Sequence, residues 1–319
     1  MQHYLFVHFR ETTTPDGEQV YFSVSRDAFT WEALNGGRPV LWAYYGDHGV
    51  RDMTVFRDPQ RGRIHIFATD LSLAYGMRGK YNHSWDNVMA HGSMDLAHWV
   101  SDDLVHWSEE EMIPVGEEGM GCVWAPDVLY DASQGDFMLH WSSLVPGKGK
   151  KKMAIWYRRT GDFLSWSEPK LLFEKEDAGV IDSAMYEEKG MYYLFVKSDH
   201  NPNRVILLRG PRATGPFERV SAFDNAMEGA ATGVYEAPTA VRMEDGSWCL
   251  FLDYYGVHGA GQGYVPYMAE SLENGKFVRS DVRFSFPFGF KHGTILPISQ
   301  QEYERMKAHD WSEVPDGRD

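Results

Sequence analysis

The stretch Val180-Ile-Asp-Ser-Ala-Met185 places an acidic residue at the start of an apolar strand, and this arrangement recurs along the chain. Besides Asp182, the recurring polar residues are Asp52, Asp127, Glu236 and His292. Positions 127, 182, 236 and 292 follow one another at steps of 55, 54 and 56 residues. Since a step of this length can supply four strands, the repetition indicates five similar β-rich units.

The first step, from position 52 to position 127, is 75 residues long and exceeds the others by about 20. It contains the Gly-, Asn- and Tyr-rich stretch Leu73–Val88, so we expect an inserted loop there. A long loop beside a groove can close it into a pocket. The insertion therefore favours a site that takes the end of a ligand rather than its middle.

Short β-branched and aromatic runs closed by turn residues predict an all-β chain, and the five repeats predict a five-bladed β-propeller. The N-terminal strand Tyr4–Phe9 belongs to no repeat of its own. We expect it to join the last blade beside Lys291–Ile298 and so close the ring. Residues 1–310 are predicted to form one propeller domain, and residues 311–319 a tail. The one expected helix is Gln300–His309, capped by Ser299.

A second repeated phrase runs from a strand through an acidic turn to an aromatic residue. Its clearest copies are Ser25–Trp31, Ser101–Trp107 and Thr160–Trp166. Each copy predicts a tight turn whose aromatic side chain packs back as the next strand begins.

The chain has 319 residues with a formal charge of −15, from 46 acidic and 31 basic residues. Such an acidic surface argues against nucleic-acid or membrane-surface binding. No basic, apolar leader is present at the N-terminus, so a cytoplasmic location is expected. Cys122 and Cys249 lie in no metal-binding or disulfide pattern and are expected to be reduced. The aromatic content of 14% suits either a β-rich core or a sugar-binding surface.

In a propeller the first strand of each blade lines the axis, so the residues that begin these strands should gather near it. Asp52, Asp182 and Glu236 would then be separated carboxyl groups at one pocket. Hydrolysis of a glycoside needs one carboxylic acid that donates a proton and one carboxylate that activates water. For Asp127 a structural alternative stays open, because a carboxylate in the Pro126-Asp127 turn can bond backbone N–H groups.

These motifs resemble those of glycoside hydrolase family 43, and the resemblance extends from Tyr4 to about Met306. It rests on Gly49–Asp52, Val123–Asp127, Val180–Asp182, Glu236–Pro238 and Lys291–Thr294. Members of this family are five-bladed propellers, mostly arabinofuranosidases, β-xylosidases and arabinanases. The chain departs from the family pattern at Met53, Ser183 and Ala237, which puts the shape of the pocket in doubt but keeps all three acids.

The resemblance implies single-step inversion, with Asp52 as general base, Glu236 as general acid and Asp182 as the group that raises the pKa of Glu236. Arg51, Trp124, Asp127, Tyr235 and His292 are the candidate substrate contacts. Each of these has an alternative besides the one given for Asp127: Arg51 and His292 could instead neutralise the acidic cluster. Trp124 could equally be a core residue, and strand alternation would turn Tyr235 away from the axis. No cofactor is required. A structural calcium or sodium ion on the axis, which His292 would contact through water, is expected from the resemblance alone.

The leading interpretation is an exo-acting, inverting glycoside hydrolase that releases L-arabinofuranose from plant-type oligosaccharides. A β-D-xylosidase and an exo-β-galactan hydrolase of the same fold are the enzyme alternatives. A propeller that binds carbohydrate without cleaving it is the alternative from another class. Glu236 separates them, because a binding protein has no need of a general acid. The oligomeric state stays open.

Overall fold

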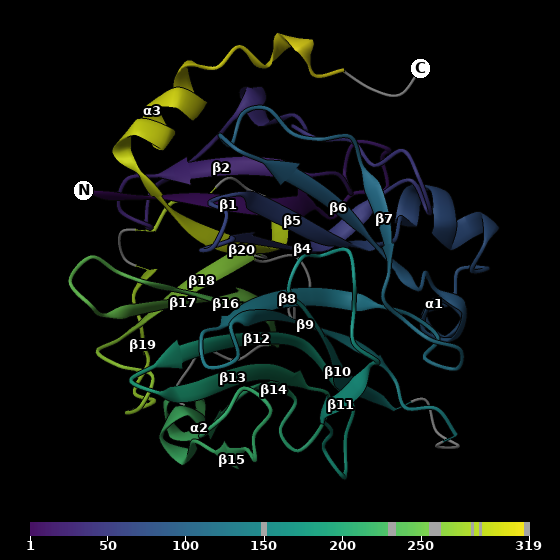
Figure 1. Ribbon diagram of the computed structural model, residues 1–319, viewed down its shortest axis with the longest axis vertical. Coiled ribbons are helices and arrows are strands. Elements are labelled where there is room, and N and C mark those ends of the chain that lie inside the picture. Colours follow the sequence, from purple (N-terminus) through teal and green to yellow (C-terminus); the bar gives the residue numbers. More distant parts are fainter. Residues whose placement is uncertain (148–151, 229–233, 255–262, 282–283, 287–288, 316–319) are drawn as a thin grey trace. The chain divides into compact units, whose positions relative to one another are not determined.

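The computed structural model describes residues 1–147, 152–228, 234–254, 263–281, 284–286 and 289–315. The strands form five four-stranded antiparallel sheets, which confirms the predicted all-β, five-bladed propeller (Figure 1). By their contacts the residues fall into a terminal unit, Met1–Ala125 with Ser285–Asp319, and a middle unit, Pro126–Phe284. Among the described residues, no helix is long and apolar enough to cross a membrane.

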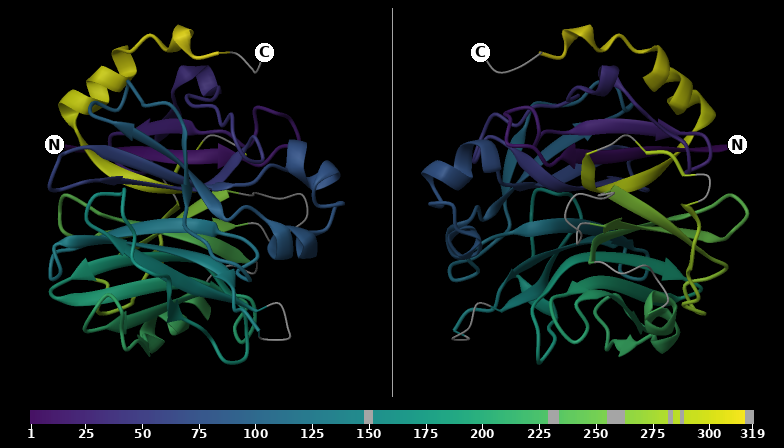
Figure 2. Two further views of the ribbon diagram at one scale, coloured as in Figure 1. Left: turned by 45° about the vertical axis from the view of Figure 1, so that its right-hand side comes forward. Right: turned by 180° about the vertical axis from the view of Figure 1, so that it is seen from behind.

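The terminal unit holds two sheets. The first has the order β20-β1-β2-β3, with strands β20 (Phe290–Ser299), β1 (Gln2–Arg10), β2 (Tyr21–Ser25) and β3 (Trp31–Ala33). The second has the order β4-β5-β6-β7, with strands β4 (Val50–Arg57), β5 (Ile64–Asp70), β6 (Asp95–Ser101) and β7 (Glu111–Pro114). The pairing of β1 with β20 confirms that the N-terminal strand completes the last blade, as the adjacent purple and yellow strands in Figure 2 show.

The middle unit holds the other three sheets. Their strands are β8 (Trp124–Asp131), β9 (Asp136–Leu144), β10 (Met153–Thr160) and β11 (Lys170–Phe173); β12 (Val180–Glu188), β13 (Met191–Ser198), β14 (Arg204–Gly210) and β15 (Glu218–Arg219); and β16 (Tyr235–Arg242), β17 (Trp248–Tyr254), β18 (Gly263–Ala269) and β19 (Val278–Arg279). The first two residues of β8 count with the terminal unit. In every sheet of this unit the strands pair in the order of the sequence.

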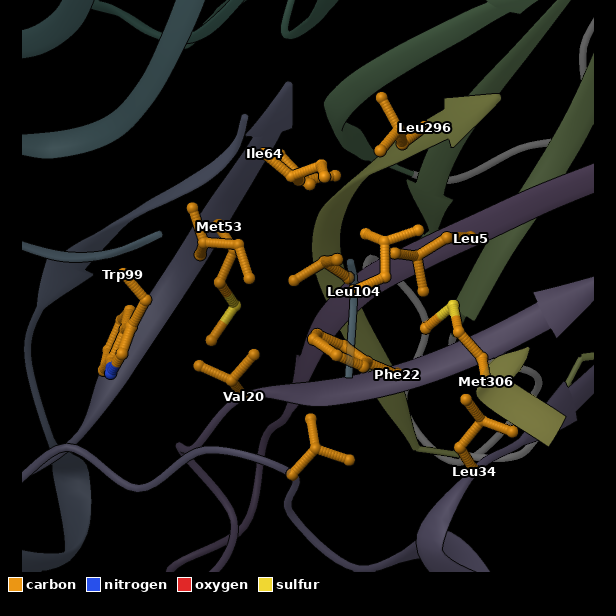
Figure 3. Packing of buried hydrophobic residues seen from close by; sticks show 14 of the residues in the cluster. Leu5, Val20, Phe22, Leu34, Met53, Ile64, Trp99, Leu104, Leu296 and Met306 are labelled. Carbon is orange, nitrogen blue, oxygen red and sulfur yellow. The ribbon is translucent and has the colours of Figure 1, made fainter. Parts of the chain in front are cut away.

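The core of the terminal unit is built from apolar side chains of both of its sheets. Leu5 and Phe22 come from the first sheet, and Met53, Ile64 and Trp99 from the second (Figure 3). All five are almost fully buried. Helix α3 (Gln300–Ala308) begins at Ser299 with a complete capping box, as predicted. Its Met306 is buried in the same cluster, and so is Trp311 at the start of the predicted tail.

Two short helices differ from the sequence-based expectation of one helix. Helix α1 (Trp85–His91) lies in the predicted insertion and is capped by Ser84, while α2 (Ser221–Glu228) contacts β14 in the middle unit. A π-helical turn, Leu73–Met77, precedes α1. The insertion is therefore ordered, compact structure rather than an open loop.

The repeated turn phrase has the geometry that its sequence predicts. In each copy one carboxylate oxygen accepts two successive backbone N–H groups two and three residues further along, at Asp27, Asp103 and Asp162. The residue after each aspartate has a positive φ, between 62° and 72°. Both cysteines are buried, and neither forms a disulfide bond.

Candidate functional site

The first strand of several blades carries the same backbone irregularity close to its start. Non-glycine residues with φ between 46° and 51° stand there: Asp52, Ala125, Asp182 and Ala237. In β4, β12 and β16 the pairing with the next strand shifts at this point, so two residues face one, as in a β-bulge. A positive φ is costly for a side chain with Cβ and is typical of functional positions.

The bulges correct the assumed equivalence of the polar residues. Asp52 and Asp182 occupy the bulge itself, whereas Glu236 comes one residue before the bulge in its strand. Asp127 comes two residues after Ala125. Equal sequence spacing therefore identified the right strand starts but not equivalent positions on them.

Asp52 lies in a strongly cationic surrounding within the terminal unit. Nδ1 of His292 is 2.7 Å from Oδ1 of Asp52, and both side chains are largely buried. Burial alone would raise the pKa of Asp52, but the charges of His292 and Arg51 and a hydrogen bond from Thr69 outweigh it and lower the pKa. Asp52 is therefore held as a carboxylate, the form that a general base requires.

Arg51 is buried and forms ion pairs within the terminal unit. Its guanidinium lies 2.9 Å from Oε1 of Glu18 and 3.5 Å from Oε1 of Glu11. Lys291 pairs with the other oxygen of Glu11 at 2.9 Å. Burial raises the pKa of Glu18 despite the opposing charge of Arg51, and the two cations lower the pKa of Glu11. These contacts favour the role of Arg51 in neutralising acidic groups near Asp52.

An aromatic pair stands beside Arg51, and the sequence predicted only one member of it. The ring of Trp85 lies over the Arg51 guanidinium at 5.7 Å and makes an edge-to-face contact with Trp124 at 6.3 Å. Trp85 is exposed, while Trp124 also packs against a small apolar cluster around Tyr81 and Val88. The observed contacts of Trp124 are with other protein side chains, and its role as a substrate contact stays a prediction. Trp85 was missed although it lies in the predicted insertion.

The insertion that carries Trp85 is anchored by a buried aspartate. Asp47 accepts hydrogen bonds from Lys80 at 2.8 Å and from the hydroxyl of Tyr81 at 2.7 Å. The backbone N–H of Asp47 donates in turn to Asp70 at the end of β5. Burial raises the pKa of Asp70 to about 6. Gly46 has a φ of 57°, in the left-handed region that favours glycine, and a Cβ there would lie 2.0 Å from Oδ2 of Asp70, so the Asp70 carboxylate excludes a larger residue.

In the middle unit Asp182 is joined to the residue that follows Glu236. Oδ2 of Asp182 accepts the backbone N–H of Ala237 at 3.2 Å, and the N–H of Asp182 donates to Oγ of Ser142 at 3.1 Å. Asp182 is buried. The structure thus brings the two predicted acids of this unit together through one backbone hydrogen bond.

Further carboxyl groups surround Glu236. In the β16–β17 ladder Glu236 stands directly opposite the fully buried Asp253, so their side chains share one face of the sheet. The pKa of Asp199 also depends on Glu236. Burial raises the pKa of Asp199 and the charge of Glu236 raises it further, whereas Lys197 lowers it. Neither Asp253 nor Asp199 was predicted. When two carboxyl groups lie close together, repulsion between their charges favours the protonated form of one of them. A general acid requires this protonated form.

Asp127 has the contacts of a structural residue. Its Oδ2 accepts the backbone N–H of Met185 in β12 at 3.0 Å and lies 3.5 Å from Nε2 of the buried His140. The structural alternative stated for Asp127, bonding of a backbone N–H, thus describes its observed contacts. The donor lies in the neighbouring blade rather than in the Pro126 turn.

Tyr235 packs into the core of the middle unit. It is buried, and its ring lies 5.1 Å from that of Tyr254 and 6.2 Å from that of Tyr267. Its observed contacts are those of a core residue, on the side that strand alternation predicts.

Comparison with known proteins gives the family context. A family model described as a probable glycosyl hydrolase domain related to family 43 matches residues 1–304. No curated protein sequence matches the chain. An endo-1,4-β-xylanase from Bacteroides thetaiotaomicron is similar in structure, with 15% identity, a TM-score of 0.59, and coverage of 87% of this chain and 90% of that one.

Two further solved structures share the fold. A family 43 β-1,3-galactosidase, solved with galactodeoxynojirimycin, has 12% identity and a TM-score of 0.55, covering 83% of this chain and 87% of that one. The catalytic domain of a family 62 α-L-arabinofuranosidase from Coprinopsis cinerea has 16% identity and a TM-score of 0.50, covering 72% and 67%. At such identities the likeness establishes a common fold.

Proposed function

Since the chain belongs to the family of glycosyl hydrolase domains related to family 43, we propose that it is an inverting, exo-acting glycoside hydrolase that releases L-arabinofuranose from oligosaccharides. Hydrolysis of O-glycosyl bonds follows from the family. We propose in addition which sugar is released, that it is removed from the chain end, and that its anomeric configuration is inverted.

In the proposed reaction Glu236 gives its proton to the glycosidic oxygen as the bond to the anomeric carbon breaks. Asp52 takes a proton from a water molecule, whose oxygen bonds to the anomeric carbon from the opposite face. Asp182 orients the Glu236 segment and raises the pKa of Glu236. The products are the inverted sugar and the shortened alcohol, after which the proton on Asp52 returns through solvent to Glu236.

The observation that carries the proposal is the contrast between the surroundings of the two acids. Asp52 lies beside His292 and Arg51, which keep it ionised. Glu236 stands opposite the buried Asp253, a neighbour that disfavours its charge. Two carboxyl groups whose environments push their pKa values apart are suited to acid and base roles.

The ordered insertion supports the exo mode. It carries the exposed Trp85 on α1 and is fastened through Asp47 to the end of β5. An anchored aromatic segment of this kind can stack on a terminal sugar and block the passage of a longer chain. Arabinofuranose is proposed because arabinofuranosidases are among the main activities of the family that the sequence motifs resemble.

The proposed ion is not required for this chemistry, and His292 does not fit a direct ligand. Its Nδ1 faces the Asp52 carboxylate, and calcium and sodium prefer oxygen ligands to an imidazole nitrogen. We expect turnover to survive dialysis against EDTA.

The test is hydrolysis of aryl α-L-arabinofuranoside, β-D-xyloside and β-D-galactoside, with the first-formed anomer followed by proton NMR. We expect arabinose to be released first as the β-anomer. Release of xylose or galactose alone would assign the corresponding alternative, and retention would overturn the roles of Asp52 and Glu236. Binding of oligosaccharides without any turnover would favour a non-catalytic propeller.

A further inference from the structure

A groove in the terminal unit is lined by residues other than those of the candidate site. Its volume is about 610 Å³, within the range of ligand-binding pockets. It is formed by Trp99 of β6 and by three segments: residues 40–45 ahead of β4, residues 105–110 between β6 and β7, and residues 309–315 after α3. None of Arg51, Asp52, Trp85, Trp124 and His292 lines it.

Two neighbouring tyrosines stand exposed on this groove. Tyr44 is 47% and Tyr45 is 56% exposed, in a chain whose other large aromatic side chains are mostly buried. The backbone N–H groups of both residues donate to the same oxygen of Glu110, at 2.5 Å and 3.2 Å. Two exposed rings are thus presented from a fixed backbone, which lowers the entropy lost when a ligand stacks on them.

The walls of the groove are fixed aromatic side chains. The indole N–H groups of Trp42, Trp107 and Trp311 donate to the backbone carbonyls of Pro315, Leu104 and Met306. These bonds hold the rings in place and commit their polar atoms to the protein. What the walls offer a ligand is therefore mainly flat, apolar ring surface.

The polar groups of the groove select the charge of its ligand. Glu109, Glu110 and Glu313 line it together with His106 and His309, and the described lining contains no lysine or arginine. Carboxylates accept hydrogen bonds from hydroxyl groups and repel anions. Aromatic faces combined with such acceptors suit a neutral sugar, which has apolar C–H faces and many hydroxyl donors.

We propose that this groove is a second, non-catalytic binding site for a neutral oligosaccharide. It would hold the enzyme on a polymer while another part of that polymer is cleaved. The proposal goes beyond the proposed catalytic function and does not depend on turnover.

The test is native affinity electrophoresis of the full chain in gels that contain arabinan, arabinoxylan, galactan or polygalacturonate. The Glu236→Gln variant is used so that the polymers stay intact. In this background Tyr44→Ala/Tyr45→Ala removes both exposed rings, and Tyr44→Phe/Tyr45→Phe is the matched control that keeps them.

We expect at least one neutral polymer to retard the parent and the Phe variant, with at least fivefold weaker apparent affinity for the Ala variant. Polygalacturonate should retard none of them. With Glu236 restored, the Ala variant should hydrolyse the aryl glycoside at the parent rate, so failure of catalysis and failure of this site are separate results. Three results would overturn the proposal: equal retardation of the Ala variant, no retardation by any neutral polymer, and binding of choline at the two tyrosines in calorimetry. The last result would mean that the groove takes a cation rather than a neutral sugar.

Discussion

The backbone N–H of Ala237 donates a hydrogen bond to Oδ2 of Asp182 at 3.2 Å. This bond fastens the peptide that follows Glu236 to a buried carboxylate, so Asp182 can fix the position of the proposed acid as well as influence its charge. Substitutions at Asp182 can separate its effect on the position of Glu236 from its effect on the charge of Glu236.

Asp182→Asn keeps an oxygen that can accept the Ala237 N–H but loses the charge, whereas Asp182→Ala loses both. We expect kcat to fall in both variants, and about tenfold to a hundredfold further in the Ala variant because the acid is then misplaced. Steady-state kinetics on the aryl glycoside measures this. Equal rates for the two variants would show that the hydrogen bond has no positioning role.

Glu236→Gln should slow the cleavage of oligosaccharides by about 10²–10⁴-fold, because the leaving oxygen no longer receives a proton. An aryl leaving group that departs readily as an anion should lose much less. Asp52→Asn should slow both substrates to a similar degree, since every substrate needs an activated water. If the leaving group makes no difference in Glu236→Gln, Glu236 is not the general acid.

His292→Gln should raise the pKa of Asp52, because it removes the positive charge that opposes the effect of burial. In the parent the pKa of Asp52 is below its usual value, so the base stays ionised until the pH falls below that range. The acidic limb of the kcat/KM profile should therefore move to higher pH in His292→Gln. The exposed His200→Gln is the control and should leave the limb in place. An unmoved limb in His292→Gln would contradict the role of the Asp52–His292 contact.

Arg51→Met should destabilise the protein by about 3–5 kcal/mol, because it leaves Glu18 buried without its cation. Adding Glu18→Gln should recover part of this loss, since the uncompensated charge is removed. Urea unfolding of both single variants and the double variant measures the coupling. Additive losses would show that the ion pair contributes nothing to the free energy of unfolding.

The buried histidines should make stability fall in acid. Burial lowers the pKa of His65 to about 4 and of His98 to about 3. The unfolded chain takes up these protons below about pH 6.5 while the folded chain does not, so stability present above that pH is lost as the pH falls towards 4.

Replacing one of these histidines tests the effect. In His98→Gln the loss of unfolding free energy between pH 6.5 and pH 4 should be smaller than in the parent by about 2–3 kcal/mol. The exposed His91→Gln should follow the parent. A parallel pH dependence in all three proteins would mean that His98 does not titrate with unfolding.

The sequence predicts the blades well because their strand starts recur at nearly constant steps. It misplaces Glu236 relative to Asp182 because a β-bulge shifts the register by one residue, and spacing alone cannot show which residue bulges. The pairing of Arg51 with Glu18 joins distant segments and leaves no local pattern.

The short helices show the limit of periodicity. Helix α2 buries only Phe223 and Met227, which are four residues apart, and a single such pair does not stand out among β-rich neighbours. Helix α1 has a readable cap at Ser84 but only seven residues. Trp85 was missed with it, since its place beside Arg51 depends on how the insertion folds back.

The sheet that contains β1 and β20 has a consequence for synthesis on the ribosome. Strand β1 is translated before the other described strands, whereas its partner β20 is translated after all of them. The sheet β4-β5-β6-β7 and the three sheets of the middle unit need no such wait, because each is made from consecutive strands. We therefore expect the four sheets made from β4 to β19 to form in the order of their synthesis, while the sheet that contains β1 stays incomplete until β20 is translated.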